Sequence, residues 1–182
     1  MILSEENGMK ICTIDPGLNG AIVIHDGEYH ILYDFKVQNE KGKNELDVSK
    51  IIEFLQEHKP DYTLIEQQLA IPQQSVIATA TTMKNYGIYL GILNALNINY
   101  TTIIPRNWMK YFIGKLKYDK KLGAQILVEK EEIFKDILYT KRGRLLDGIV
   151  DAALMNIYLR ENLKKEKKKT AKINIETQEK KC

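Results

Sequence analysis

The sequence is poor in the residues on which most zinc-binding and disulfide-rich proteins depend. Its 182 residues include two cysteines, three histidines, four prolines and one tryptophan. The cysteines, Cys12 and Cys182, form no metal-binding spacing and no disulfide framework. The histidines also lack the spacing of metal ligands. These shortages exclude a disulfide scaffold or zinc finger and favour a reducing, intracellular compartment.

Long apolar runs are absent as well. No stretch approaches the ~18–20 apolar residues that cross a bilayer, and residues 1–8 form a polar leader without the pattern of a signal peptide. We therefore expect a cytoplasmic protein, in a bacterium or an infected host cell, with no membrane partner. The chain is 44% hydrophobic and 28% charged, which is typical of one globular domain and excludes wholesale disorder.

Basic residues are concentrated in two regions of a chain with a net charge of only +3. Residues 106–121 contain six basic residues and one acid, and residues 160–182 contain nine basic residues and four acids. Such clusters favour a polyanionic partner. On charge alone, a lysine-rich solvated surface explains them equally well.

The hydrophobic pattern predicts an α/β domain over residues 9–163. Three strands, at 9–15, 21–26 and 29–37, form an antiparallel meander, and a helix at 48–55 ends before Pro60. A strand at 62–66 arrives through that helix, so it is expected parallel to the first strand. The remaining expected elements are a long helix at 73–96, a strand at 100–104, helices at 105–113, 119–132 and 145–163, and a basic, disordered tail at 164–182.

Four acids occupy positions where bare charges are costly. Asp15 and Glu66 end two otherwise apolar strands, and Asp147 and Asp151 lie four residues apart on one face of an apolar helix. If the two strands are parallel neighbours, both acids emerge at one edge of the sheet, where the helix can complete a cluster. A divalent cation relieves the repulsion in such a cluster, and oxygen ligands suit Mg²⁺ or Mn²⁺.

Each acid also has a purely structural interpretation. Asp15 can cap a turn, Glu66 can lie at an exposed strand end, and Asp147 can stabilise a helix N-terminus. Only Asp151 is then unexplained. The ordered set of a strand Asp, a strand Glu and a helical Asp-x-x-x-Asp favours the metal site over four unrelated explanations.

Three sequence blocks resemble the active-site blocks of RuvC-type Holliday-junction resolvases, most closely the compact phage and prophage branch. They are residues 14–21 (IDPGLNGA), 64–67 (LIEQ) and 147–154 (DGIVDAAL). Residues 86–93 (YGIYLGIL) and 104–112 (IPRNWMKYF) also resemble stretches of that branch. Bacterial RuvC usually spaces its last two carboxylates by three residues rather than four, and both spacings keep the pair on one helical face.

This resemblance implies an RNase H-like fold with a mixed five-stranded sheet, a three-strand meander plus two parallel strands, flanked by helices. It also implies a homodimer that cuts four-way DNA junctions by paired nicks, with two Mg²⁺ or Mn²⁺ ions per active site and no small-molecule cofactor. By motif, the catalytic and metal-binding residues are Asp15, Glu66, Asp147 and Asp151. Asp15 would bridge the two ions, Glu66 would hold one, and the helical pair would hold the other.

A DNA partner gives the basic clusters a role, because lysine and arginine neutralise phosphates and interleaved aromatics can stack on exposed bases. Trp108 is more often a core residue. The residues expected to contact DNA are Lys84, Arg106, Lys110, Lys115, Lys117, Lys120, Lys121, Lys141, Arg142 and Arg144.

The helix at 73–96 has two apolar stripes, and the family uses this region for its two-fold interface. We therefore expect one stripe to face a partner, with Leu93 among the partner-facing residues. Two other functions stay open: another RNase H-like nuclease acting on RNA–DNA hybrids or structured RNA, and a non-catalytic junction-binding protein. An ATPase of the actin-like fold needs roughly twice this length.

Overall fold

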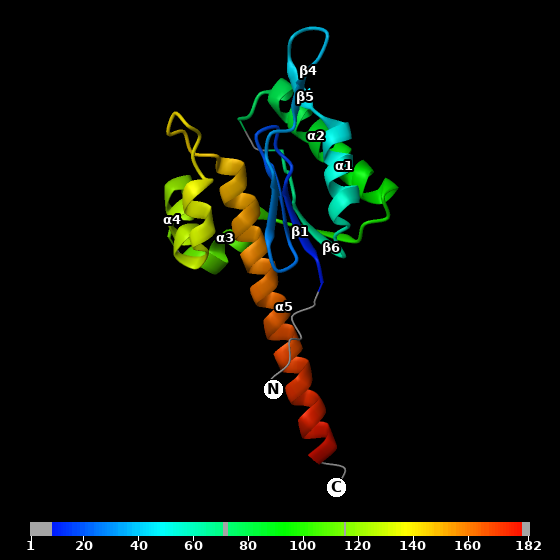
Figure 1. Cartoon of the computed structure of the whole chain (residues 1–182), viewed down its shortest axis with the longest axis vertical. Helices are drawn as coiled ribbons and strands as arrows, with labels where there is room; N and C mark the ends of the chain where they lie inside the picture. The colour runs from blue at the N-terminus through cyan, green and yellow to red at the C-terminus, as the bar shows by residue number, and fades with distance from the viewer. Residues whose placement is uncertain (1–8, 71–72, 115, 180–182) are drawn as a thin grey trace.

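The computed structural model describes residues 9–70, 73–114 and 116–179 (Figure 1). The expected leader at 1–8 and Lys115 lie outside these residues. A five-stranded sheet has the order β3-β2-β1-β6-β7. Its strands are β1 (Ile11–Asp15), β2 (Ala21–His25), β3 (Tyr29–Leu32), β6 (Tyr62–Glu66) and β7 (Tyr100–Ile103). β1 pairs antiparallel to β2 and parallel to β6, so the predicted mixed sheet is confirmed.

Helices cover both faces of the sheet (Figure 1). One face carries α1 (Val48–His58) and α2 (Val76–Ala95), and the other carries α5 (Asp147–Glu179), with α3 (Pro105–Ile113) and α4 (Lys120–Lys130) beside it. A hydrophobic core lies on each face of the sheet, and neighbouring residues of β1 point into different cores. Cys12 and Ile14 pack with α1 and α2, whereas Ile11 packs with α5. A short 3-10 helix, Glu132–Asp136, follows α4. Within the described residues, no helix is long and apolar enough to span a bilayer.

The third strand is shorter than expected. β3 ends at Leu32, and the chain then forms a separate two-stranded hairpin from β4 (Lys36–Gln38) and β5 (Asn44–Leu46). Phe35 explains the break, because its fully buried side chain enters the α1/α2 core and its ring lies 6.4 Å from the ring of Tyr89. The predicted single strand at 29–37 is therefore wrong beyond Leu32.

The last helix is longer than expected. Where the sequence predicts a disordered tail from 164, α5 instead continues to Glu179 and extends beyond the sheet (Figure 1). Residues 164–169 are lysines and one glutamate, which have high helix propensity, so a helix that begins in the core can continue through them. At the start of the extension, Lys165 donates a 2.9 Å hydrogen bond to the hydroxyl of Tyr111 on α3.

Candidate active site

The four predicted carboxylates come from three elements that meet at one edge of the sheet. Asp15 is the last residue of β1, and Glu66 is the last residue of the parallel neighbour β6. Parallel strands end at the same edge, so these two acids emerge together. Asp147 begins α5 and Asp151 follows one turn later, on the helix that packs across β1 and β2.

Gly20 lies in the turn after β1, and Gly148 lies where α5 meets that turn. A Cβ atom on Gly148 would lie 2.3 Å from the carbonyl oxygen of Asn19, and one on Gly20 would lie 2.0 Å from the carbonyl oxygen of Asp15. Real side chains do not tolerate such distances. Gly20 therefore allows the tight turn after β1. Gly148 allows the first turn of α5 to rest on that turn, which places the helical acids beside Asp15.

The carboxylates differ in their exposure. Glu66 and Asp151 are buried, with 7% and 4% of their surface exposed, whereas Asp15 is half-buried and Asp147 is exposed. Burial, followed by repulsion from Asp151, raises the pKa of Asp15 to about 6. Burial, followed by repulsion from Asp15 and Asp151, raises the pKa of Glu66 to about 7. The carboxylates thus repel one another in a poorly solvated site.

Protein donors hold the two buried carboxylates. Trp108 Nε1 donates to Glu66 Oε1 at 3.0 Å, and Gln68 Nε2 donates to Glu66 Oε2 at 3.3 Å. The hydroxyl of Tyr118 donates to Asp151 Oδ1 at 2.7 Å, and Lys120 Nζ forms an ion pair with Asp151 Oδ2. Every oxygen of these two carboxylates therefore has a polar partner within the chain.

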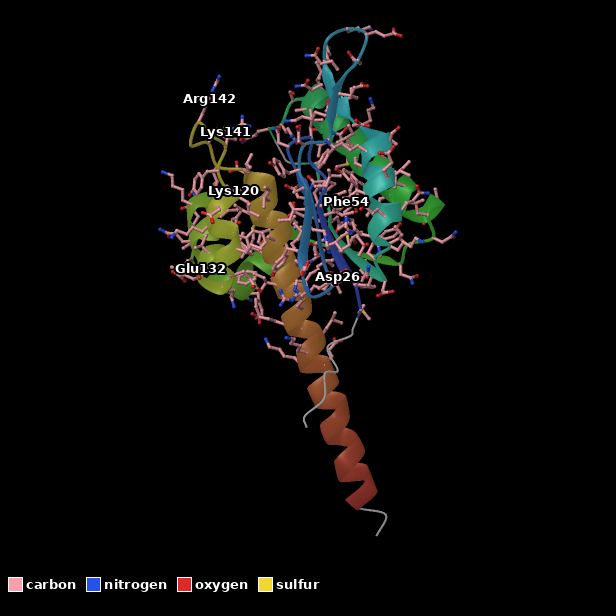
Figure 2. The ribbon with its side chains drawn as sticks, viewed as in Figure 1. Asp26, Phe54, Lys120, Glu132, Lys141 and Arg142 are labelled. Carbon is pink, nitrogen blue, oxygen red and sulfur yellow. The ribbon has the colours of Figure 1, made fainter. Side chains whose placement is uncertain are left out.

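Lys120 lies within this cluster, where its Nζ pairs with Asp151. Figure 2 places it beside the first turns of α5, below the loop that carries Lys141 and Arg142. Burial alone would lower the pKa of Lys120. The charge and hydrogen bond of Asp151, together with the charges of Asp15 and Glu66, outweigh burial, so the pKa of Lys120 is raised. The pKa of Asp151 is also raised, because its burial outweighs the attraction of Lys120.

The donor set suits a hard divalent cation. It contains only carboxylate oxygens, and their mutual repulsion is of the kind that Mg²⁺ or Mn²⁺ relieves. Across the described parts of the chain, no three Asp, Glu, His or Cys side chains are gathered closely enough to form a ready-made metal site. The residues thus fit the cation by the chemistry of their donor atoms, and the protein donors named above bond to the oxygens of Glu66 and Asp151.

Basic residues flank the carboxylates on the α5 side. The loop before α5 carries Lys141 and Arg142 at its exposed tip (Figure 2). Arg144 lines a cavity of about 410 Å³ together with Lys36 at the base of the hairpin and Asp147 at the start of α5. This cavity therefore joins a positively charged rim to the edge of the carboxylate cluster.

The second basic region lies on and after α3. Arg106 and Lys110 line a cavity of about 600 Å³ with Met109, Ile113 and Tyr118. Lys117 and Lys121 are exposed. Lys84 of α2 forms a 3.0 Å ion pair with Glu45 of the hairpin, so it already has an acidic partner within the chain.

The two stripes of α2 have different surroundings. Tyr89 and Leu93 are fully buried in the core between α2 and the sheet, so the expectation that Leu93 faces a partner is wrong. The opposite face is exposed, with Val76 and Ile77 at 85% and 80% exposure. The physical reason is that periodicity identifies two apolar faces but does not tell which of them meets the sheet.

Comparisons with known proteins give matches in structure only. The sequence matches no protein-family model and no curated protein. The structure is similar to that of Thermus thermophilus RuvC, with a TM-score of 0.53 and 15% identity over 85% of this chain and 97% of that chain. It is also similar to T. thermophilus RuvC in complex with a Holliday junction substrate, with a TM-score of 0.51 and 12% identity over 80% of this chain and 89% of that chain.

The fold is that of RuvC. The expected RNase H-like architecture, a mixed five-stranded sheet flanked by helices, is therefore confirmed.

The contacts made by Trp108, Tyr118 and Gln68 do not follow from the sequence. Trp108 is expected in the core, and it is fully buried there. A buried indole N–H needs an acceptor, and this rule is the available signal for its bond to Glu66. Tyr118 and Gln68 offer no comparable signal, because composition and periodicity do not indicate which carboxylate a polar side chain will meet.

Proposed function

We propose that the chain is a divalent-metal-dependent endonuclease that cuts four-way DNA junctions. The observation that carries this proposal is the placement of Asp15, Glu66 and Asp151. These acids repel one another at the edge of a RuvC fold, and they come from β1, β6 and α5. Clusters of acids with raised pKa values are typical of functional sites.

In this proposal Asp15, Glu66, Asp147 and Asp151 hold the cations, two per active site. When bound, the cations supply Lewis-acid polarisation of the scissile phosphodiester and lower the pKa of the attacking water. The chain itself contributes orientation, because Trp108 and Tyr118 fix the carboxylates. Lys120 adds a positive charge beside Asp151, where it can offset the negative charge of the approaching phosphate.

The basic residues are proposed to bind phosphates on both sides of the cluster. Lys141, Arg142 and Arg144 lie before α5, and Arg106, Lys110, Lys117 and Lys121 lie on α3, on α4 and between them. These two basic regions flank the acids, so a DNA strand in contact with both would pass the carboxylates. Phosphate contacts position a strand without reading its sequence, which is consistent with selection by DNA structure.

A homodimer is proposed on the exposed face of α2. Val76 and Ile77 are large apolar side chains in solvent, and Ala80 on the same face is small. A two-fold dimer would present two active sites to a junction that itself has two-fold symmetry. Light scattering should give about 42 kDa, twice the 21.0 kDa chain, and Ile77→Glu should give the monomer mass.

The deciding experiment is cleavage of a synthetic four-way junction by the purified protein, with Mg²⁺ and with EDTA. We expect paired, symmetric nicks in Mg²⁺ only, with 5′-phosphate and 3′-hydroxyl ends that a ligase can seal. Linear duplex DNA and an RNA–DNA hybrid are tested in parallel. Preferential cleavage of the hybrid would identify a different RNase H-like nuclease, and junction binding without cleavage in any metal would identify a non-catalytic binding protein.

The basic region at 164–182 is proposed to add non-specific DNA affinity. Because Lys165 bonds to Tyr111, the chain is best truncated after Glu166. Each phosphate interaction that the truncation removes should reduce the slope of log K against log salt by ~0.9 on duplex DNA. We expect weaker, less salt-sensitive binding and unchanged cleavage at saturating protein. A fall in melting temperature or in kcat would instead indicate an ordered structural role.

A further inference from the structure

Trp108 occupies an unusual position for the only tryptophan of the chain. Its side chain is fully buried, and its one polar atom, Nε1, is directed at a carboxylate of the candidate active site. Tryptophan can donate a hydrogen bond but cannot accept one. The bond to Glu66 Oε1 at 3.0 Å therefore favours an ionised Glu66 in one fixed orientation.

Tyr118 makes the equivalent contact on the other buried acid. Its hydroxyl donates to Asp151 Oδ1 at 2.7 Å, and its ring packs edge to face against the ring of Trp108, with centroids 5.4 Å apart. The two aromatic residues thus form one unit that contacts carboxylates on β6 and α5. We call Trp108 and Tyr118 the aromatic pair.

The aromatic pair also lies beside the basic residues that follow β7. Arg106 and Lys110 lie on α3 with Trp108, and they line one cavity with Tyr118. α3 is a short helix that begins at Pro105 and ends at Ile113. A phosphate bound by Arg106 or Lys110 would therefore contact the helix that carries the indole donor to Glu66.

We propose that Trp108 is a positioning residue for the metal site, which holds Glu66 in its cation-binding orientation with support from the ring of Tyr118. The proposal rests on the metal-dependent nuclease proposed above. Hydrogen bonds from outer residues to metal ligands change metal affinity or activity by about 10–100-fold when they are removed. We expect an effect in that range at Glu66.

Because the chain has one tryptophan, the indole N–H can be removed with almost no change of shape. A tryptophan auxotroph supplied with benzothienylalanine replaces the N–H of Trp108 by sulfur and leaves the rest of the side chain nearly unchanged. Fluorotryptophan, which keeps the N–H, is the matched control. Equal melting temperatures of the two proteins show that the core is intact in both.

Cation affinity is measured by calorimetry with Mg²⁺ and with Ca²⁺ in the absence of DNA. We expect the benzothienylalanine protein to bind about tenfold or more weakly than the fluorotryptophan protein. Equal affinities would overturn the positioning role and leave the proposed nuclease intact. If the unmodified protein binds neither cation, the proposed function fails and the positioning role falls with it.

Tryptophan emission gives a second readout, which tests whether the cation binds beside Trp108. A cation bound at Glu66 changes the field at the indole of Trp108, so titration of the unmodified protein should shift the emission with the calorimetric affinity. Glu66→Gln should abolish this shift. Cation binding by calorimetry with no change in emission would overturn the proposal.

Tyr118→Phe tests the second member of the aromatic pair. We expect weaker cation binding, because Asp151 loses one of its donors. Tyr111→Phe is the matched control, since it removes a hydroxyl from α3 that contacts Glu161 instead of the carboxylate cluster. An equal loss of cation affinity in both variants would show that removal of a tyrosine hydroxyl outside the carboxylate cluster is enough, and would contradict a specific role for the pair.

Discussion

Thr13 Oγ1 donates a 2.7 Å hydrogen bond to the carbonyl oxygen of Ala152, which joins the middle of β1 to the second turn of α5. Thr13 lies two residues before Asp15, and Ala152 follows Asp151 directly. Both groups are buried. This bond therefore ties together the two elements that supply three of the four carboxylates.

Thr13→Val should weaken this connection without changing the size of the side chain. Removal of a buried hydrogen bond lowers the free energy of unfolding by about 1–2 kcal/mol. Urea denaturation measures the loss. Thr102→Val, an exposed change on β7, is the control and should alter stability by less than about 0.5 kcal/mol. Similar values for the two variants would contradict a structural role for the Thr13 bond.

Asp15→Asn and Glu66→Gln should abolish cleavage of a four-way junction while leaving binding intact or stronger. On the proposed function, each change removes a charge that would bind a cation and reduces the repulsion between the protein and the phosphates. Binding is measured by gel shift in Ca²⁺ and in EDTA, and cleavage in Mg²⁺. Asp26→Asn is the control, because Asp26 forms an ion pair with Lys10 away from the candidate site. Cleavage by either active-site variant at the wild-type rate would refute the assignment.

The stability of the cation-free protein should depend on pH through Glu66 and Asp15. Their pKa values in the folded chain, about 7 and about 6, exceed the ordinary values of 4.5 and 3.8. The folded state therefore binds more protons than the unfolded state between about pH 4 and 7, and stability in EDTA should rise as the pH falls through this window.

Glu66→Gln tests whether the carboxylate of Glu66 causes this pH dependence of stability. At pH 8 in EDTA it should be more stable than the wild type, on the order of 1–3 kcal/mol, because the repelled charge is gone. Its melting temperature should also vary less between pH 8 and 5. The same protonation should weaken Mg²⁺ binding by the wild type below pH 7. A wild type that loses stability on acidification from pH 8 to 6 would contradict the sign of these shifts.

Lys120→Gln should destabilise the cation-free protein, because Asp151 is buried and loses its positively charged partner. Lys120 is partly exposed, so we expect a loss of about 1–3 kcal/mol rather than the larger cost of breaking a fully buried pair. Saturating Mg²⁺ should restore part of the lost stability. Lys121→Gln, the exposed neighbour, is the control. The measurement is thermal unfolding in EDTA and in Mg²⁺.

Gly148→Ala should separate α5 from the turn after β1. The added Cβ would lie 2.3 Å from the carbonyl oxygen of Asn19, so one of the two backbones must shift. We expect a loss of about 1–3 kcal/mol and reduced cleavage. Gly91→Ala on α2 has open space around the new Cβ and should be neutral or stabilising by up to about 1 kcal/mol. Full activity of Gly148→Ala would show that the close approach is not needed.

The sequence is sufficient for the sheet and for the positions of the acids, because both depend on local patterns. β1 and β6 are apolar runs that end in an acid, and the helix before β6 favours parallel pairing. The hairpin at β4 and β5 does not follow from such patterns, because the burial of Phe35 is a tertiary effect. The length of α5 is also not predicted, since a segment without an apolar face is typical of disorder as well as of an extended helix.

The surroundings of the acids cannot be predicted in the same way. The basic composition of residues 106–121 favours DNA contacts for all of its lysines, yet Lys120 forms an ion pair with the buried Asp151. Composition does not distinguish a lysine that faces solvent from one that compensates a buried acid. That distinction depends on how α4 packs against α5, which involves residues about 30 positions apart in sequence.

The chain order of the carboxylates has a consequence for the newly made protein. Asp15 and Glu66 are synthesised early, whereas Asp147 and Asp151 belong to the last helix. A nascent chain that still lacks α5 carries only half of the acidic cluster, and so does a fragment left by premature termination. Both also lack the surface of α5, including Ala152, against which β1 packs. On the proposed function, such a chain is harmless to the DNA around it, and the capacity to cut arises only when α5 has been made.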